Sequence, residues 1–134
     1  MKKLLLLSCL LLIGCGQSQD QNEKWIKEII ATGLSERGDV LQAQGDVFSD
    51  YKVYRDGNND GVCYEYIFAD DPSEDLSADA FSAVRGELIG MVRDIVLDDP
   101  GLKLAMEHGV YLRFIYRAPG GRAIADEVVT SSDL

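Results

Sequence analysis

Apolar residues recur every three or four positions in two segments of the chain, the pattern of a helix with one buried face. The first predicts a helix over residues 23–35, with Gly38 just past its end. Its apolar positions are Trp25, Ile26, Ile29, Ile30 and Leu34. The second predicts a helix from near Ser77 to Leu97, with its stripe at Phe81, Val84, Leu88, Met91, Val92 and Ile95. A third, short helix is expected to open at Asp99-Pro100, because aspartate suits the N-cap and proline the first helical position.

Alternating β-branched and aromatic residues predict four strands in two hairpins. Residues 51–55 and 62–69 flank a dense turn sequence, and residues 110–117 and 122–129 flank Pro-Gly-Gly. Residues 39–50 are ambiguous, but Gly38, Gly45 and scattered aspartates favour a loop with one helical turn. The order helix, hairpin, two helices, hairpin predicts an α+β fold. It would be a small antiparallel sheet built from two hairpins and packed on amphipathic helices.

The N-terminal residues follow a different pattern. Two lysines precede residues 4–13, which are almost entirely apolar. This run is shorter than the about 20 residues that span a bilayer, but it suits the apolar region of an export signal. It ends in Leu12-Ile13-Gly14-Cys15, which resembles the lipobox of bacterial lipoproteins. The resemblance implies that the signal is removed and that Cys15 becomes the lipid-bearing first residue.

The lipobox resemblance also implies an organisation and an address. Residues 1–14 would be the signal peptide. Residues 17–22 are polar and lack apolar spacing, which predicts a lipidated tether over residues 15–22. The length that is left suits a single domain over residues 23–134. A diacylglyceryl group and a further chain such as palmitate would anchor the protein stably, because two chains suffice. Gly16 stands where enteric lipoproteins retained in the inner membrane carry aspartate. This favours the outer membrane, facing the periplasm, or the outer face of the plasma membrane where there is one membrane. An ordinary secretory signal is the alternative.

Charge narrows the choice of partners. The chain has 13 basic and 23 acidic residues, and loss of Lys2 and Lys3 with the signal leaves a formal charge of −12. A domain this acidic is expected to repel nucleic acid and anionic lipid head groups, since binding either requires a basic footprint. The sequence therefore predicts no nucleic-acid partner.

The turn of the first hairpin is the sharpest candidate for a metal site. Asp56, Asn58 and Asp60, followed by glycine, resemble the opening of an EF-hand calcium loop. The twelfth position, however, is Ile67 where a glutamate is expected, and Glu65 comes two residues too early. Two interpretations follow: a plain hairpin turn without a cofactor, or a weak calcium site on these three side chains.

No catalytic constellation stands out. Cys63 is the only cysteine after Cys15, and its aromatic neighbours predict a small buried residue. The single histidine, His108, falls at a predicted helix end, where the carbonyl-rich terminus favours it. Zinc-type spacings, phosphate-binding glycine loops and serine elbows do not occur. The sequence thus predicts a protein that is not an enzyme.

All six tyrosines fall on predicted strands. Cross-strand packing explains them without a function. Alternatively, some share an exposed face with arginines and form a partner-binding surface, since both residue types are enriched at interfaces. The candidates for this surface are Tyr54, Arg55, Tyr64, Arg113 and Arg117.

About thirty residues near the C-terminus resemble small uncharacterised bacterial envelope proteins, which pair a helix opening at D-P or N-P with a strand reading roughly G-V-x-x-R-Y-x-Y. The matching stretches are Asp99-Pro100-Gly101-Leu102, His108-Gly109-Val110, Leu112-Arg113-Phe114-Ile115-Tyr116-Arg117 and Gly120-Gly121-Arg122-Ala123-Ile124. The resemblance implies a fold and an envelope address, but no activity.

Together these features predict a membrane-anchored lipoprotein of the cell envelope whose domain binds another envelope protein. Two alternatives stay open. One is a small-ligand or calcium-binding module. The other is an inhibitor of an envelope-degrading enzyme such as a cationic lysozyme, toward which an acidic surface would steer association.

Overall fold

The computed structural model describes residues 17–72 and 78–134. The predicted signal peptide, the predicted lipidation site Cys15 and the predicted helix start at Ser77 lie outside these ranges. In chain order, the elements are α2 (Gln17–Ser35), α3 (Arg37–Gln44), β1 (Phe48–Arg55), β2 (Gly61–Phe68), α4 (Ala78–Asp98), α5 (Pro100–Glu107), β3 (Tyr111–Arg117), β4 (Ala123–Val129) and the short 3₁₀ helix η2 (Ser131–Asp133).

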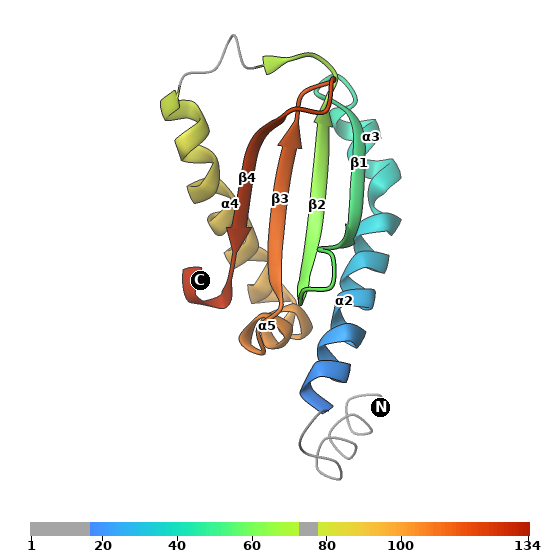
Figure 1. Cartoon of the computed structure of the whole chain (residues 1–134), viewed down its shortest axis with the longest axis vertical. Coiled ribbons are helices and arrows are strands. Elements are labelled where there is room, and N and C mark those ends of the chain that lie inside the picture. Colours follow the sequence, from blue (N-terminus) through green and yellow to red (C-terminus); the bar gives the residue numbers. More distant parts are fainter. Residues whose placement is uncertain (1–16, 73–77) are drawn as a thin grey trace.

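The four strands form one sheet in the order β1-β2-β3-β4 (Figure 1). The predicted α+β fold with two hairpins is confirmed: β1 pairs antiparallel with β2, and β3 with β4. The sheet is not wholly antiparallel, however, because the hairpins meet through a parallel β2–β3 pair running from Gly61 opposite Tyr111 to Ile67 opposite Arg117. The helices α4 and α5 form the crossover that a parallel pair requires.

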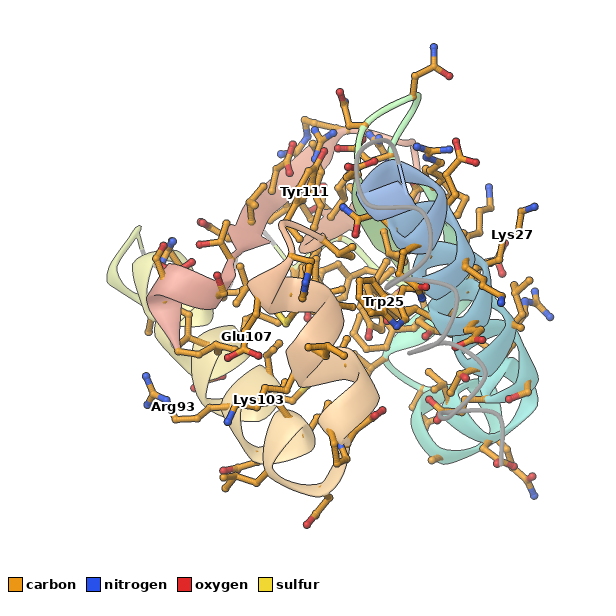
Figure 2. All side chains as sticks on the ribbon, turned by 90° about the horizontal axis from the view of Figure 1, so that it is seen from below. Trp25, Lys27, Arg93, Lys103, Glu107 and Tyr111 are labelled. Carbon is orange, nitrogen blue, oxygen red and sulfur yellow. The ribbon has the colours of Figure 1, made fainter. Side chains whose placement is uncertain are left out.

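The helices share one face of the sheet and build a single core with it. Val92 and Val96 of α4 and Ile26 of α2 belong to one buried cluster with Leu112 and Val129 of the strands. The helix α5 lies across the end of the sheet at which α2 begins (Figure 1). Seen from this end, Trp25 lies between α2 and α5 (Figure 2), with its ring centroid 5.2 Å from that of His108.

Two predictions about the first 50 residues are wrong. The helix α2 begins at Gln17 rather than at residue 23, so residues 17–22 are helical. Asn22 is only 5% exposed, and its amide donates hydrogen bonds to the His108 carbonyl (3.0 Å) and the Asp60 carboxylate (3.1 Å). A polar residue there reflects buried hydrogen bonding and not exposure to solvent.

The second wrong prediction is the loop over residues 39–50. The segment contains most of α3 and the start of β1. Two apolar residues of α3, Val40 and Leu41, pack against the core. Arg37 ties the helix to the sheet by donating to the Tyr51 carbonyl (3.1 Å) and to Asp50 (2.6 Å).

Local signals later in the chain are confirmed. The Asp99 carboxylate accepts a hydrogen bond from the Leu102 backbone N–H (3.0 Å), and proline occupies the first turn of α5. Gly109, with a φ of +98°, ends the helix in a backbone conformation that favours glycine. This turn leads the chain directly into β3.

Candidate functional site

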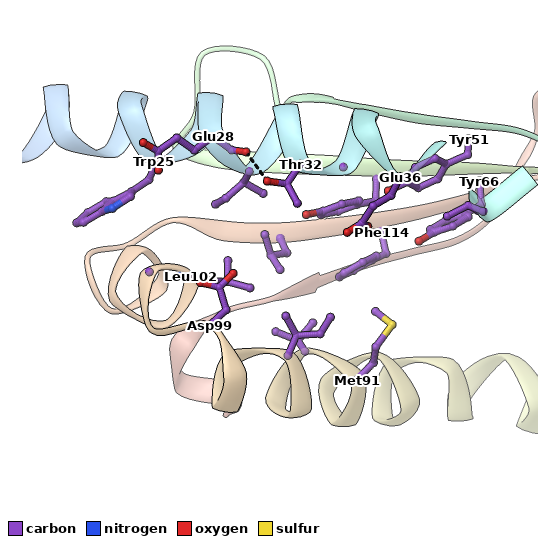
Figure 3. Close-up of a pocket in the computed structure, with 18 residues that line it drawn as sticks. Trp25, Glu28, Thr32, Glu36, Tyr51, Tyr66, Met91, Asp99, Leu102 and Phe114 are labelled. Atoms are coloured by element: carbon purple, nitrogen blue, oxygen red, sulfur yellow. Dashed lines mark hydrogen bonds between the residues drawn. The ribbon is translucent and has the colours of Figure 1, made fainter. Parts of the chain in front are cut away.

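The helix layer leaves part of the sheet uncovered. The helix α2 packs on β1 and β2, and α4 packs on β4, while both contact α5. Between them lies a groove of about 370 Å³, which is open above the central strands β2 and β3 (Figure 3). Gly33 allows α2 to pack closely on β1, because a β-carbon at this position would lie only 2.9 Å from Val53 Cγ2.

The floor of the groove is aromatic. Tyr64 stacks on Phe114 across β2 and β3, with ring centroids 5.1 Å apart and an interplanar angle of 12°. Tyr66 stacks in the same way on Tyr116 at 4.9 Å, and contacts Tyr51 at 5.0 Å. Burial, with the charge of Glu36 as a lesser cause, raises the pKa of Tyr51 to about 12. The floor is therefore uncharged at neutral pH.

The two walls carry apolar side chains at helical spacing. On α2, Trp25 and Ile29 line the groove one turn apart, and on α4, Met91 and Ile95 do the same. Met91 and Ile95 are 40% and 44% exposed, so the α4 wall presents apolar surface to solvent. Large exposed apolar side chains that line a hollow are typical of a binding surface.

The charges around the groove all have one sign. Its charged lining residues are Glu28 and Glu36 on the α2–α3 side and Asp99 at the start of α5, and no lysine, arginine or histidine of the described residues lines it. Figure 3 shows Glu36 beside Phe114, whereas Glu28 lies near Thr32 on α2 and Asp99 lies near Leu102. An apolar groove with an acidic rim favours a ligand that is apolar in its centre and cationic at its edges.

The opposite face of the sheet carries no described helix and is called the open face below. Its own side chains cover it. Glu65 is only 7% exposed. It accepts a hydrogen bond from the Tyr54 hydroxyl (2.7 Å) and forms an ion pair with Arg117 (3.0 Å). Burial raises the pKa of Glu65, but these hydrogen bonds and the positive charges of Arg117 and Lys52 outweigh it and lower the pKa. Cys63, fully buried beside them, confirms the prediction of a small buried residue.

The structure does not bring the five predicted partner-surface residues together. Tyr54, Arg113 and Arg117 belong to the open face, whereas Tyr64 is on the groove floor. The reason is the alternation of side chains along a strand: Tyr64 pairs with Val53, so it faces away from Tyr54. Arg55 lies at the end of β1 and bonds to the turn, through the Asn59 carbonyl at 2.9 Å.

Two of the three predicted calcium-loop side chains, Asp56 and Asp60, are held by other contacts. The carboxylate of Asp56 accepts from the Tyr111 hydroxyl and from Arg113 (3.0 Å), and that of Asp60 accepts from Asn22 and Arg55. The Asp56 N–H donates to the Gly61 carbonyl (2.9 Å), which closes a hairpin turn. Over residues 17–72 and 78–134, no three His, Cys, Asp or Glu side chains are grouped to hold a metal. Calcium at Asp56, Asn58 and Asp60 stays a prediction.

Sequence reasoning missed the groove. Its walls come from the apolar stripes of α2 and α4, which were assigned entirely to the core. Helical spacing carries no signal for the groove, because it shows which side of each helix is apolar but not how far apart the two helices lie on the sheet. None of the described helices is long and apolar enough to cross a membrane.

No family model matches the chain, and no curated protein matches its sequence. Among solved structures, the chain is similar to the pilotin EpsS of the type 2 secretion system of Vibrio vulnificus. The two are 16% identical, with a TM-score of 0.40 over 83% of this chain and 96% of that one. It is also similar to the type II secretion system pilotin AspS from Vibrio cholerae, at 12% identity and a TM-score of 0.40 over 84% and 97% of the two chains.

Proposed function

We propose that this chain is a lipid-anchored, non-enzymatic protein of the cell envelope. We further propose that its α2–α4 groove binds an amphipathic helical segment of a partner protein, flanked by lysine or arginine. The observation that carries the proposal is a groove whose aromatic floor is only half-buried at Tyr64 and Tyr66, combined with an exclusively acidic set of charged lining residues. The predicted lipid on Cys15 supplies the envelope address, as the lipobox resemblance implies.

The dimensions of the groove suit a helix. The helix α2 and the residue after it contribute lining residues from Trp25 to Glu36, which at 1.5 Å per residue covers about 16 Å, or three turns. A helix that lies in such a groove presents apolar side chains at every third or fourth position. These would contact the half-buried Tyr64 and Tyr66 below, and Met91 and Ile95 on the α4 wall.

The acidic residues specify the flanks of that helix. Glu28 and Glu36 are eight residues apart on one helical side, a separation of about 12 Å along the axis. Two basic residues seven or eight positions apart on a bound helix would lie opposite them. The formal charge of −12 after signal removal would further steer a cationic segment toward this protein.

Site-specific photo-crosslinking in cells tests the proposal. A photoreactive residue replaces Met91 or Ile95 in the full-length lipoprotein, and Val128, which is 37% exposed on the open face, serves as the control position. We expect the two groove positions to crosslink the same segment of one envelope protein. We expect mass spectrometry to identify that segment as amphipathic, with lysine or arginine at its flanks.

Two results would contradict the proposal. The first is an identical set of crosslinks from Met91, Ile95 and Val128, which would mean that no surface is selective. The second is a crosslinked segment without basic residues or without helical apolar spacing, because neither the rim nor the floor would then recognise it.

A further inference from the structure

The end of the molecule at which α2 begins carries a second surface, separate from the groove. Asn22 holds α2 to this end through hydrogen bonds to the His108 carbonyl and to Asp60. The helix α5 lies at the same end, across the foot of the sheet (Figure 1). This end is therefore the part of the domain joined most directly to the predicted lipid anchor.

Little chain separates the anchor from this end. From Gln17 to Asn22 the backbone is helical, which covers about 8 Å, and the two residue steps from Cys15 to Gln17 add at most about 7 Å. Asn22 thus lies within about 15 Å of the lipidated residue. The polar zone on each side of a bilayer is itself about 5 to 8 Å thick, so this end of the domain is held near the membrane surface.

A second hollow lies there, between α4, α5 and η2, with a volume of about 310 Å³. Its apolar lining residues are Val96, Leu97, Met106 and Leu134, and its charged ones are Arg93, Lys103 and Glu107. Figure 2 shows Arg93, Lys103 and Glu107 near one another in the view from this end. Leu97 is 77% exposed, the most of any described large apolar side chain.

The two cations of this hollow are available to a ligand. Within the described part of the chain, neither Arg93 nor Lys103 forms an ion pair, whereas Arg55, Arg113 and Arg117 are all paired with carboxylates. Arg93 donates one hydrogen bond, to the Asp133 carbonyl at 3.2 Å. Unpaired cations beside exposed apolar surface fit the phosphate and acyl boundary of a phospholipid layer.

We infer that the α4–α5 end of the domain rests on the phospholipid bilayer, with Arg93 and Lys103 against lipid phosphates and Leu97 at the interface. The inference rests on the lipid anchoring in the proposed function, but not on the occupant of the groove. The overall acidity of the chain does not oppose it, because the anchor supplies the affinity and the contact is local. Its consequence is that a partner segment would meet the groove close to the membrane.

Lysine footprinting tests this contact. The processed full-length lipoprotein is placed in vesicles of phosphatidylethanolamine and phosphatidylglycerol and treated with a membrane-impermeant acylating reagent. Lys52, whose side chain is 53% exposed on the open face, is the internal reference for Lys103. We expect the Lys103-to-Lys52 labelling ratio to fall about threefold relative to a phosphate-free nonionic detergent, the protection expected of an exposed ion pair. Arg93→Glu should restore the ratio, and the matched Arg93→Lys variant should not.

The outcomes separate the two proposals. A fully acylated protein whose labelling ratio is the same in vesicles and detergent would overturn the membrane contact alone. Equal ratios for Arg93→Glu and Arg93→Lys would do the same. An N-terminal peptide without acyl chains would overturn the anchoring itself, and with it this inference.

Discussion

The two faces of the sheet are built from alternate residues of the same strands, yet their side chains are covered in different ways. On the open face, polar side chains such as Glu65 and Arg117 satisfy one another and cover Cys63 without any helix. On the helix face, α2 and α4 cover Tyr51 and Phe114, but a groove stays open between the two helices and leaves Tyr64 and Tyr66 half-buried.

This contrast separates a stabilising surface from a binding surface. A buried polar network that is fully paired gains little from a further partner, since its donors and acceptors are already used. Exposed apolar surface in a concave site still gains from being covered. The groove is therefore the better candidate, although the open face carries more arginine.

The largest expected effect comes from truncating neighbours that point to opposite faces. Phe114 and Ile115 are 2% and 3% exposed. Phe114→Ala is expected to cost about 4 kcal/mol of unfolding free energy, because the helix face is fixed and leaves a cavity. Ile115→Ala is expected to cost about 2 kcal/mol, because flexible arginine stems can collapse into the space. Urea denaturation measures both values, and equal losses would mean that the two faces are equally rigid.

The second prediction tests how much the charge of Glu65 stabilises the open face. Glu65→Gln is expected to lower the unfolding free energy by about 1 to 3 kcal/mol at pH 7, because Arg117 loses its charged partner while half-buried. The pKa of Glu65 is lowered in the folded protein. The carboxylate therefore stabilises the fold above its unfolded pKa of about 4.5, and this contribution is lost as the pH falls through the folded pKa.

Denaturation of both proteins from pH 7 to pH 3 measures this difference. The wild type and Glu65→Gln should converge at the acid end. A gap that is constant with pH would show that Glu65 contributes through packing and not through charge.

Most of the fold could be predicted from the sequence because its signals are local. The cap at Asp99, the turn over residues 56–61 and the glycine at position 109 each follow from the chemistry of a few adjacent residues. The parallel β2–β3 pair could not be predicted in the same way. It depends on how the crossover helices return the chain, which no local pattern records.

The groove was unpredictable for a related reason. Helical periodicity shows which side of α2 or α4 is apolar, but not how far apart the two helices lie on the sheet. Strand alternation likewise separates Tyr64 from Cys63, but it does not identify the covered face. Long-range packing decides both, so the predicted surface that combined Tyr54 with Tyr64 mixed residues of two faces.

A matched pair of lysine substitutions tests the groove directly. Ile95 lines the groove and Leu104 does not, yet they are 44% and 45% exposed. Ile95→Lys is expected to weaken binding of a synthetic peptide of the crosslinked segment about tenfold, or 1.4 kcal/mol, and Leu104→Lys is expected to leave it unchanged. Both should change the unfolding free energy by only about 0.5 kcal/mol.

Fluorescence of Trp25, the single tryptophan, reports peptide binding from within the groove. Equal affinities of the two variants would mean that the peptide binds elsewhere. A large loss of stability in Ile95→Lys alone would indicate that this wall belongs to the core and not to a ligand site.

The smallest expected effect concerns the acidic rim. Glu28→Gln and Glu36→Gln should each weaken the same peptide by about 0.2 to 1 kcal/mol, since exposed ion pairs contribute no more than this. Asp39→Asn, an exposed residue outside the groove lining, is the control and should have no effect. The losses should disappear in about 1 M salt, where the screening length falls to about 3 Å. If they persist there, the glutamates act through hydrogen bonds to the peptide, and the preference for basic flanks would have to come from elsewhere.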